Sequence, residues 1–293
     1  MRVQVPLNNF FAMLVISISG PRRHYKRLVG DANHAYATIL VALANIPAEP
    51  VVPEDLALDW TGQNPEHSLD TARDAAKRAV LGLIAASIDE YLGTLVSLPS
   101  ILPPTLATET ADTRMLGAKL TKLFDANDYE ESDALIRLLL YWRNREFHSG
   151  AQDATKEIEK LERNKPKIET RYPRFDVTKA ISHCRLRTKP SNIDILTLLQ
   201  ASHRFVAQTD EFFLRNINPR TFIRAFLGDC HETNKAALKS AWAKDPDRRK
   251  TWMLNMLSHH GLVETGAPPA GSSPDFTAAI DEAIALPLNT LVP

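Results

Sequence analysis

The side chains most capable of chemistry are concentrated in one short stretch, residues 143–148 (Arg-Asn-Arg-Glu-Phe-His). Histidine moves protons near neutral pH, and the planar guanidinium of arginine binds oxyanions through two parallel hydrogen bonds. Asn144 and His148 are four residues apart, so on a helix they lie on one face, one turn apart. Arg143 is turned about 140° away from His148 on the same helix. It can reach the same point only through its long side chain or across a dimer axis.

A strongly apolar helix is expected to position this stretch. Residues 125–149 are predicted to be helical, and large apolar side chains are so dense at 138–142 that the helix must be buried nearly all round. Gly150 stands where a glycine often ends a helix. Polar side chains at the end of such a helix need partners, because an unpaired buried polar group is costly. We therefore interpret residues 143–148 as the candidate functional site.

Apolar residues recur at helical spacing along almost the whole chain, so the sequence predicts an all-α fold with at most a few residues in strands. The other long helices are expected at 72–98 and 192–216, packed against the helix that carries the motif. Shorter helices are expected at 23–44, 113–124, 155–162, 235–243, 248–260 and 276–285. A stretch of Gly, Pro and Ser at 266–274 is interpreted as a flexible linker.

We divide the chain into an N-terminal helical segment (1–68), a four-helix core (69–217) and a C-terminal helical segment (218–293). The apolar run at 7–18 is too short to span a bilayer as a helix and lacks a strongly basic start and an A-x-A cleavage signature. It is interpreted as a buried first helix, with a secretion signal as the alternative.

Two cysteines, Cys184 and Cys230, are too few for a disulfide framework, and two buried thiols are favoured over one long-range bridge. The expected location is the cytoplasm, with no membrane association. Net charge is zero, so any binding to nucleic acid must come from a local patch. Residues 143–189 hold 13 basic and 7 acidic residues, a net charge of +6. We interpret this stretch as a surface for a polyanion, with solvated helix faces as the alternative.

In this setting the motif resembles that of the HEPN superfamily, whose ribonuclease members carry R-x4-6-H, commonly with Asn directly after the Arg. Arg143, Asn144 and His148 match it with four intervening residues, near the end of the penultimate long helix of the predicted four-helix core. The resemblance covers roughly residues 69–217, and within that range only the motif is specific. Plasmid- or defence-associated HEPN proteins with helical extensions are the closest comparison.

The resemblance implies metal-independent RNA cleavage, in which the ribose 2′-hydroxyl attacks the adjacent phosphate and leaves a cyclic phosphate and a 5′-hydroxyl. Arg143 would bind the phosphate as its charge rises in the transition state, and His148 would transfer a proton. Asn144 would orient His148 or hold the phosphate or the 2′-hydroxyl. Further RNA contacts are expected from Arg145, His183, Arg185 and Arg187. For Arg145, an ion pair with Glu146 and a position in solvent are the alternatives.

The implied setting is a toxin–antitoxin or phage defence system, with RNA as substrate and an antitoxin or regulatory protein as a further partner. The resemblance also implies a homodimer whose two motifs face one cleft. No cofactor and no metal are expected. A non-catalytic HEPN module that binds RNA or protein is the main alternative, and a structural partner in a larger complex is another.

Two other clusters have suitable residue types but weaker patterns. Cys230-His231 and His259-His260 could ligate zinc, yet they lack the spacing of a zinc site, so chance is favoured. Trp242 and Trp252 lie near basic residues and could stack on RNA bases, but packed aromatic side chains are favoured.

Overall fold

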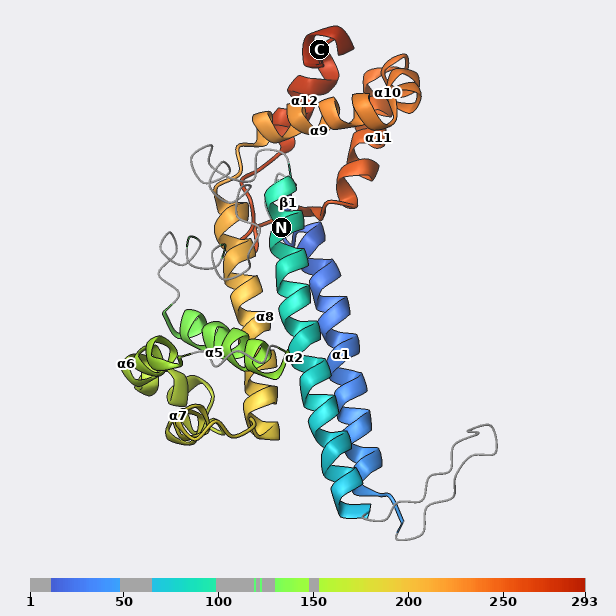
Figure 1. The fold of residues 1–293 in the computed structure, drawn as a ribbon. Helices are drawn as coiled ribbons and strands as arrows, with labels where there is room; N and C mark the ends of the chain where they lie inside the picture. The colour runs from blue at the N-terminus through green and yellow to red at the C-terminus, as the bar shows by residue number, and fades with distance from the viewer. Residues whose placement is uncertain are drawn as a thin grey trace, which may run out of the picture. The chain divides into compact units, whose positions relative to one another are not determined.

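The computed structural model of the chain describes residues 12–47, 65–98, 119, 122, 130–147 and 153–292. Within these residues the only strands are β1 (Met13–Ile16) and β2 (Leu262–Thr265), and the rest of the regular structure is helical (Figure 1). The predicted all-α fold is therefore confirmed. The helix predicted at 113–124 lies outside the described residues, apart from Lys119 and Lys122.

The three predicted long helices are present as α2 (Pro65–Ser97), α5 (Glu130–Phe147) and α8 (Asn192–Arg215), and α1 spans Gly20–Ala44. The shorter helices are α6 (Thr155–Arg171), α7 (Val177–Arg185), α9 (Pro219–Thr233), α10 (Lys235–Trp242), α11 (Pro246–Ser258), α12 (Thr277–Ala285) and α13 (Leu288–Leu291).

The chain divides into two units. The motif unit consists of His24–Tyr91 and Met115–Val206, and the terminal unit consists of Met1–Arg23, Leu92–Arg114 and Ala207–Pro293. Each unit is assembled from segments that are distant in sequence. The three consecutive segments proposed from the sequence stay a prediction.

The motif unit is organised around Tyr25 of α1, which is 1 % exposed. Its hydroxyl donates to Ser202 Oγ of α8 at 2.7 Å, and its ring meets the Tyr91 ring of α2 edge-on, with centroids 6.1 Å apart. The Tyr91 hydroxyl donates to the Val206 carbonyl of α8 at 3.4 Å. Burial raises the pKa of Tyr25, which keeps its hydroxyl protonated as a donor. These contacts pack α1, α2 and α8 against one another.

Helix α5 completes the motif unit and is buried along most of its length, as predicted. Leu135, Leu139 and Trp142 are fully buried. Asp133, in the first turn of α5, accepts a hydrogen bond from Lys160 of α6. At the same end of α5, Arg204 of α8 forms an ion pair with Glu131. The three long helices therefore contact one another, and α5 brings Arg143 and Asn144 to a partly exposed position.

The terminal unit contains the small sheet. β1 pairs antiparallel with β2, with Ile16 opposite Leu262. On the other edge of β1, the Ser273 N–H donates to the Ile16 carbonyl at 3.0 Å, and the Phe276 N–H donates to the Leu14 carbonyl at 2.7 Å. The end of the stretch interpreted as a flexible linker is therefore bonded to β1.

The prediction of a buried helix over 7–18 is wrong for the part that the structure describes, since Met13–Ile16 is a strand. Its Leu-Val-Ile core suits a strand as well as a helix. The partners that decide between them, β2 and the segment before α12, lie at the other end of the chain. Local apolar spacing contains no information about such distant partners.

Helix α6 is longer than predicted, because it continues through Pro166 to Arg171. Proline lacks the N–H that would bond to the Glu162 carbonyl, and the exposure of both residues lets water take its place. Helices α7, α9 and the short α13 were not predicted. The start of α9 carries a local signal, because Asn218 caps it by accepting from the Thr221 N–H at 3.1 Å and proline follows directly.

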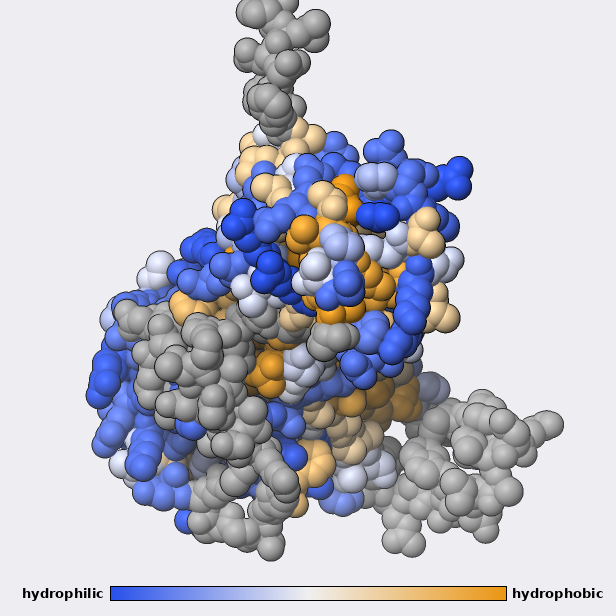
Figure 2. Space-filling model, turned by 90° about the horizontal axis from the view of Figure 1, so that it is seen from above, coloured by the Kyte–Doolittle hydropathy of each residue, from blue (hydrophilic) through white to orange (hydrophobic). Residues whose placement is uncertain are grey.

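Figure 2 shows hydrophilic residues over much of the described surface in that view, with hydrophobic residues gathered near its centre. Among the described residues one helical segment, Glu66–Ser97, is long and apolar enough to cross a membrane by length and composition. Half of its most apolar window is buried inside the protein, and buried core helices pass the same test. The expectation of no membrane association stays a prediction.

Candidate functional site

The last turn of α5 carries two of the three motif residues. Arg143 and Asn144 are partly exposed, although Trp142 directly before them is fully buried. Arg143 Nη1 donates to Asn144 Oδ1 at 2.9 Å, and the guanidinium carbon lies 5.8 Å from the centroid of the Phe147 ring. A cation above an aromatic face is attracted by the quadrupole of the ring. Contacts within its own helix thus help to hold the Arg143 guanidinium at a partly exposed position.

Helix α2 fixes the end of α5 through two contacts. A Cβ added to Gly82 would lie 3.1 Å from Phe147 Cζ, so the ring packs closely where a glycine leaves room. Arg78, one turn earlier, donates from Nε to Glu146 Oε2 at 3.0 Å. Because Phe147 also contacts Arg143, the packing on α2 contributes to the position of the candidate phosphate-binding group.

Arg145 is engaged inside the motif unit. Its Nη2 donates to the Thr188 carbonyl at 2.7 Å and lies 3.3 Å from Glu146 Oε1. Its guanidinium carbon lies 5.8 Å from the centroid of the Tyr141 ring, and the side chain is 14 % exposed. Of the two alternatives considered for Arg145, the structure contains the ion pair with Glu146. A contact between Arg145 and RNA stays a prediction. The bond to Thr188 ties the motif turn to the segment between α7 and α8.

His148 lies outside the described residues, as does Gly150. Its convergence with Arg143 and Asn144 therefore stays a prediction.

His183 of α7 is oriented by the start of α8. Its Nδ1 lies 3.1 Å from Oδ2 of Asp194, a carboxylate that is almost fully buried. The same oxygen accepts the Ser191 N–H at 2.7 Å, while Ser191 Oγ accepts the Asp194 N–H at 3.2 Å. This reciprocal pair is a capping box. Sequence reasoning missed Asp194, although the Ser-x-x-Asp pattern at 191–194 was a visible signal.

The basic stretch after the motif is paired with acidic side chains at several points. Arg185 Nη2 donates to Glu162 Oε1 at 2.9 Å, and Lys189 pairs with Asp74 of α2. Both pairs are substantially exposed, so each contributes little to stability and exchanges readily with solvent. A polyanion that binds here must compete with these carboxylates for the cations.

Arg187 is exposed, and its side chain has no hydrogen-bond or ion-pair partner among the described residues. Its backbone φ is 54°. The Arg187 N–H donates to the Cys184 carbonyl at 3.3 Å, and the Thr188 N–H donates to the His183 carbonyl at 3.0 Å. This pair of bonds ends α7 with a left-handed residue, a position where glycine is usual. The left-handed conformation costs a non-glycine residue about 1–2 kcal/mol.

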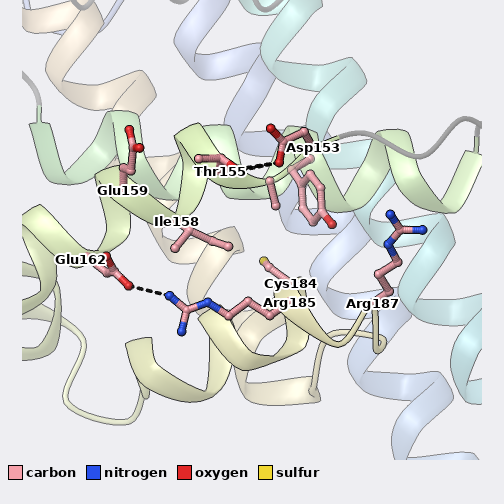
Figure 3. Close-up of a pocket in the computed structure, with 10 residues that line it drawn as sticks. Asp153, Thr155, Ile158, Glu159, Glu162, Cys184, Arg185 and Arg187 are labelled. Carbon is pink, nitrogen blue, oxygen red and sulfur yellow. Dashed lines mark hydrogen bonds and ion pairs between the residues drawn. The ribbon is translucent and has the colours of Figure 1, made fainter.

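A pocket of about 420 Å³ lies between α5, α6 and α7 (Figure 3). Its lining includes Tyr141 of α5, Glu159 of α6, Cys184 of α7 and Arg187. Burial raises the pKa of the Cys184 thiol to about 12, so the thiol stays protonated and is a poor nucleophile. The lining includes no histidine. The chemistry of this pocket suits binding rather than catalysis.

The weaker sequence candidates remain structural in the described part of the chain. Cys184 and Cys230 are buried and free, which confirms the prediction of two buried thiols. Within the described residues no group of three His, Cys, Asp or Glu side chains is placed to hold a metal ion. Trp242 is buried, donates from Nε1 to the Leu286 carbonyl at 3.2 Å and meets Trp252 edge-on, as a packed aromatic pair does.

No protein-family model, no curated protein and no solved structure matches this chain.

Proposed function

We propose that the chain is a HEPN-type endoribonuclease that cleaves RNA without a metal ion, using Arg143, Asn144 and His148. One observation carries the proposal. Arg143 and Asn144 are hydrogen-bonded to each other at the partly exposed end of a helix that is otherwise deeply buried. A guanidinium and an amide at this position, with a histidine four residues after the amide in the sequence, support a proposal of phosphate chemistry.

The proposed reaction is an internal transfer at phosphorus. The ribose 2′-hydroxyl gives its proton to a base and attacks the adjacent phosphorus, and the bond to the 5′-oxygen of the next nucleotide breaks as that oxygen accepts a proton from an acid. Arg143 stabilises the charge that grows on the non-bridging oxygens, because a guanidinium donates two parallel hydrogen bonds. His148 transfers a proton to or from one of the two reacting oxygens, since imidazole titrates near neutral pH. Asn144 orients one of these groups.

We also propose an oligomeric state and a cellular context for the protein. A homodimer would bring two Arg143–His148 sets to one groove, which suits a substrate that a single helix end holds by few contacts. The cytoplasm is the proposed location, and a toxin–antitoxin or phage defence system is the proposed context. An antitoxin or another regulatory protein would then restrain the activity.

A non-catalytic module that binds RNA or protein is the second candidate. The internal contacts of two neighbouring side chains favour it: Arg145 bonds to Thr188, and His183 contacts Asp194. Such groups stabilise the surface of a binding module without taking part in a reaction.

Metal dependence distinguishes the proposed mechanism from metal-assisted hydrolysis. Purified protein incubated with RNA should cleave it equally well with and without EDTA, because the mechanism uses only protein side chains. End-group analysis should find cyclic phosphates and 5′-hydroxyls. Cleavage that EDTA abolishes and magnesium restores would contradict the mechanism. Retention of RNA without any cleavage would favour the second candidate.

A further inference from the structure

The pocket between α5, α6 and α7 carries opposite charges at its two ends. Figure 3 shows Glu159 on one side and Arg187 on the other, with Ile158 and Cys184 between them. Neither the Glu159 nor the Arg187 side chain has a hydrogen-bond or ion-pair partner among the described residues. The pocket therefore offers one carboxylate and one guanidinium without a bonded partner, and both apolar and polar side chains line the space between them.

The other charged groups of the lining are already bonded. Asp153 accepts from the Thr155 N–H at 3.0 Å and from its Oγ1 at 2.6 Å, and Glu162 accepts from Arg185 at 2.9 Å. Glu159 and Arg187 are therefore the two charged side chains of the lining that form no hydrogen bond or ion pair within the described residues. A fitting ligand has hydrogen-bond donors at one end and an anion at the other.

A nucleotide with an amino-bearing base has this distribution of groups. Its exocyclic amino group donates to a carboxylate, and its phosphate accepts two parallel bonds from a guanidinium. The volume of about 420 Å³ is within the range of roughly 300–1,000 Å³ typical of small-molecule sites. Ile158 provides an apolar contact for the base.

The backbone at Arg187 supports the same assignment. Arginine occupies a left-handed helix end that glycine would adopt without strain, and its side chain forms no compensating bond within the described residues. Residues held in such conformations concentrate at ligand sites.

The pocket and the motif share structural elements. Tyr141 lines the pocket two residues before Arg143 on α5, and Arg145 bonds to Thr188, the neighbour of Arg187. We propose that the pocket binds one nucleotide of the RNA substrate, with its phosphate on Arg187 and the amino group of its base on Glu159. The choice of RNA as the source of this nucleotide rests on the proposed function.

Titration of the purified full-length chain with CMP and with UMP, followed by calorimetry at one fixed salt concentration, tests the assignment. The two bases differ by an amino group in place of a carbonyl, so CMP should bind at least about tenfold more tightly than UMP. Glu159→Gln should reduce this preference to about twofold or less, because an amide can donate to the uracil carbonyl as well as accept from the cytosine amino group.

Arg187→Gly should weaken the binding of both nucleotides by about tenfold or more, because it removes the phosphate contact. It should leave the thermal midpoint unchanged or raise it by about 2 °C, because glycine relieves the left-handed backbone. Lower affinity in this variant is then not a consequence of unfolding. Arg174→Ala, at an exposed arginine outside the pocket lining, is the matched control and should bind like the wild type.

The results separate this inference from the ribonuclease proposal. Nucleotide binding that responds to both variants, in a protein that never cleaves RNA, would support the pocket and refute the enzyme. Equal affinities for CMP and UMP, no nucleotide binding, or affinities that neither variant changes would overturn the pocket assignment, even where RNA is cleaved.

Discussion

Arg143→Ala is expected to slow RNA cleavage by a factor on the order of 10²–10³, the usual effect of removing one donor that stabilises transition-state charge. Arg143→Lys is expected to stay within about tenfold of the alanine variant. The contacts of Arg143 explain why lysine cannot replace it. Its Nη1 donates to Asn144, and its guanidinium lies over the Phe147 ring. A planar fork can keep such a contact and still present other N–H groups to a phosphate, whereas an ammonium lacks this geometry.

The measurement is the initial rate of cleavage of a defined RNA under single-turnover conditions. Arg220→Ala is a matched control, because Arg220 is an exposed arginine of the terminal unit that pairs with Glu282 at 2.8 Å. It should cleave at the wild-type rate. Full activity in Arg143→Lys would show that a point charge suffices, which contradicts the bidentate role given to Arg143.

Trp142→Ala is expected to lower the free energy of unfolding by about 3–5 kcal/mol, as large aromatic truncations in cores do. Trp142 is fully buried, and its Nε1 has no hydrogen-bond partner among the described residues. Its contribution therefore comes from packing. Trp142→Phe should cost about 1.5 kcal/mol or less, because it keeps an aromatic ring and removes the unpaired donor.

Urea unfolding followed by circular dichroism measures both variants. Val41→Ala is the control for a change of side-chain size at an exposed position of the same unit, and it should stay within about 0.5 kcal/mol of the wild type. If Trp142→Ala cost no more than Val41→Ala, α5 would not be the buried element on which the position of Arg143 depends.

Most of the helical architecture was accessible from the sequence, because a buried helix shows its apolar face in the spacing of its own residues. The dense apolar run before Arg143 predicted α5 and its burial, and Leu139 and Trp142 are fully buried. The start of α9 was missed because polar signals mark it, a capping asparagine and a proline, rather than apolar spacing.

The parts of the fold that were missed depend on distant partners. β1 is a strand because β2 and the segment around Ser273 supply its hydrogen bonds. The local sequence of β1 does not indicate which distant residues will pair with it.

In the candidate site, too, the features set by local sequence were predicted and those set by distant partners were missed. Helical spacing placed Arg143 and Asn144 correctly near the end of a buried helix, where they follow the fully buried Trp142 as the next two residues. The bond from Arg145 to the Thr188 carbonyl and the contact of His183 with Asp194 join different helices. Residue types alone therefore suggested RNA contacts for side chains that the fold engages internally.

We propose above all that the motif beginning at Arg143 cleaves RNA, and His148→Ala tests this most directly. Purified wild-type and variant proteins are incubated with total RNA, and their circular dichroism spectra are compared to establish that both are folded. We expect cleavage by the wild type and none by a folded His148→Ala variant, because the reaction loses its proton-transfer group. Cleavage by the variant at the wild-type rate, or no cleavage by the wild type, would contradict the claim.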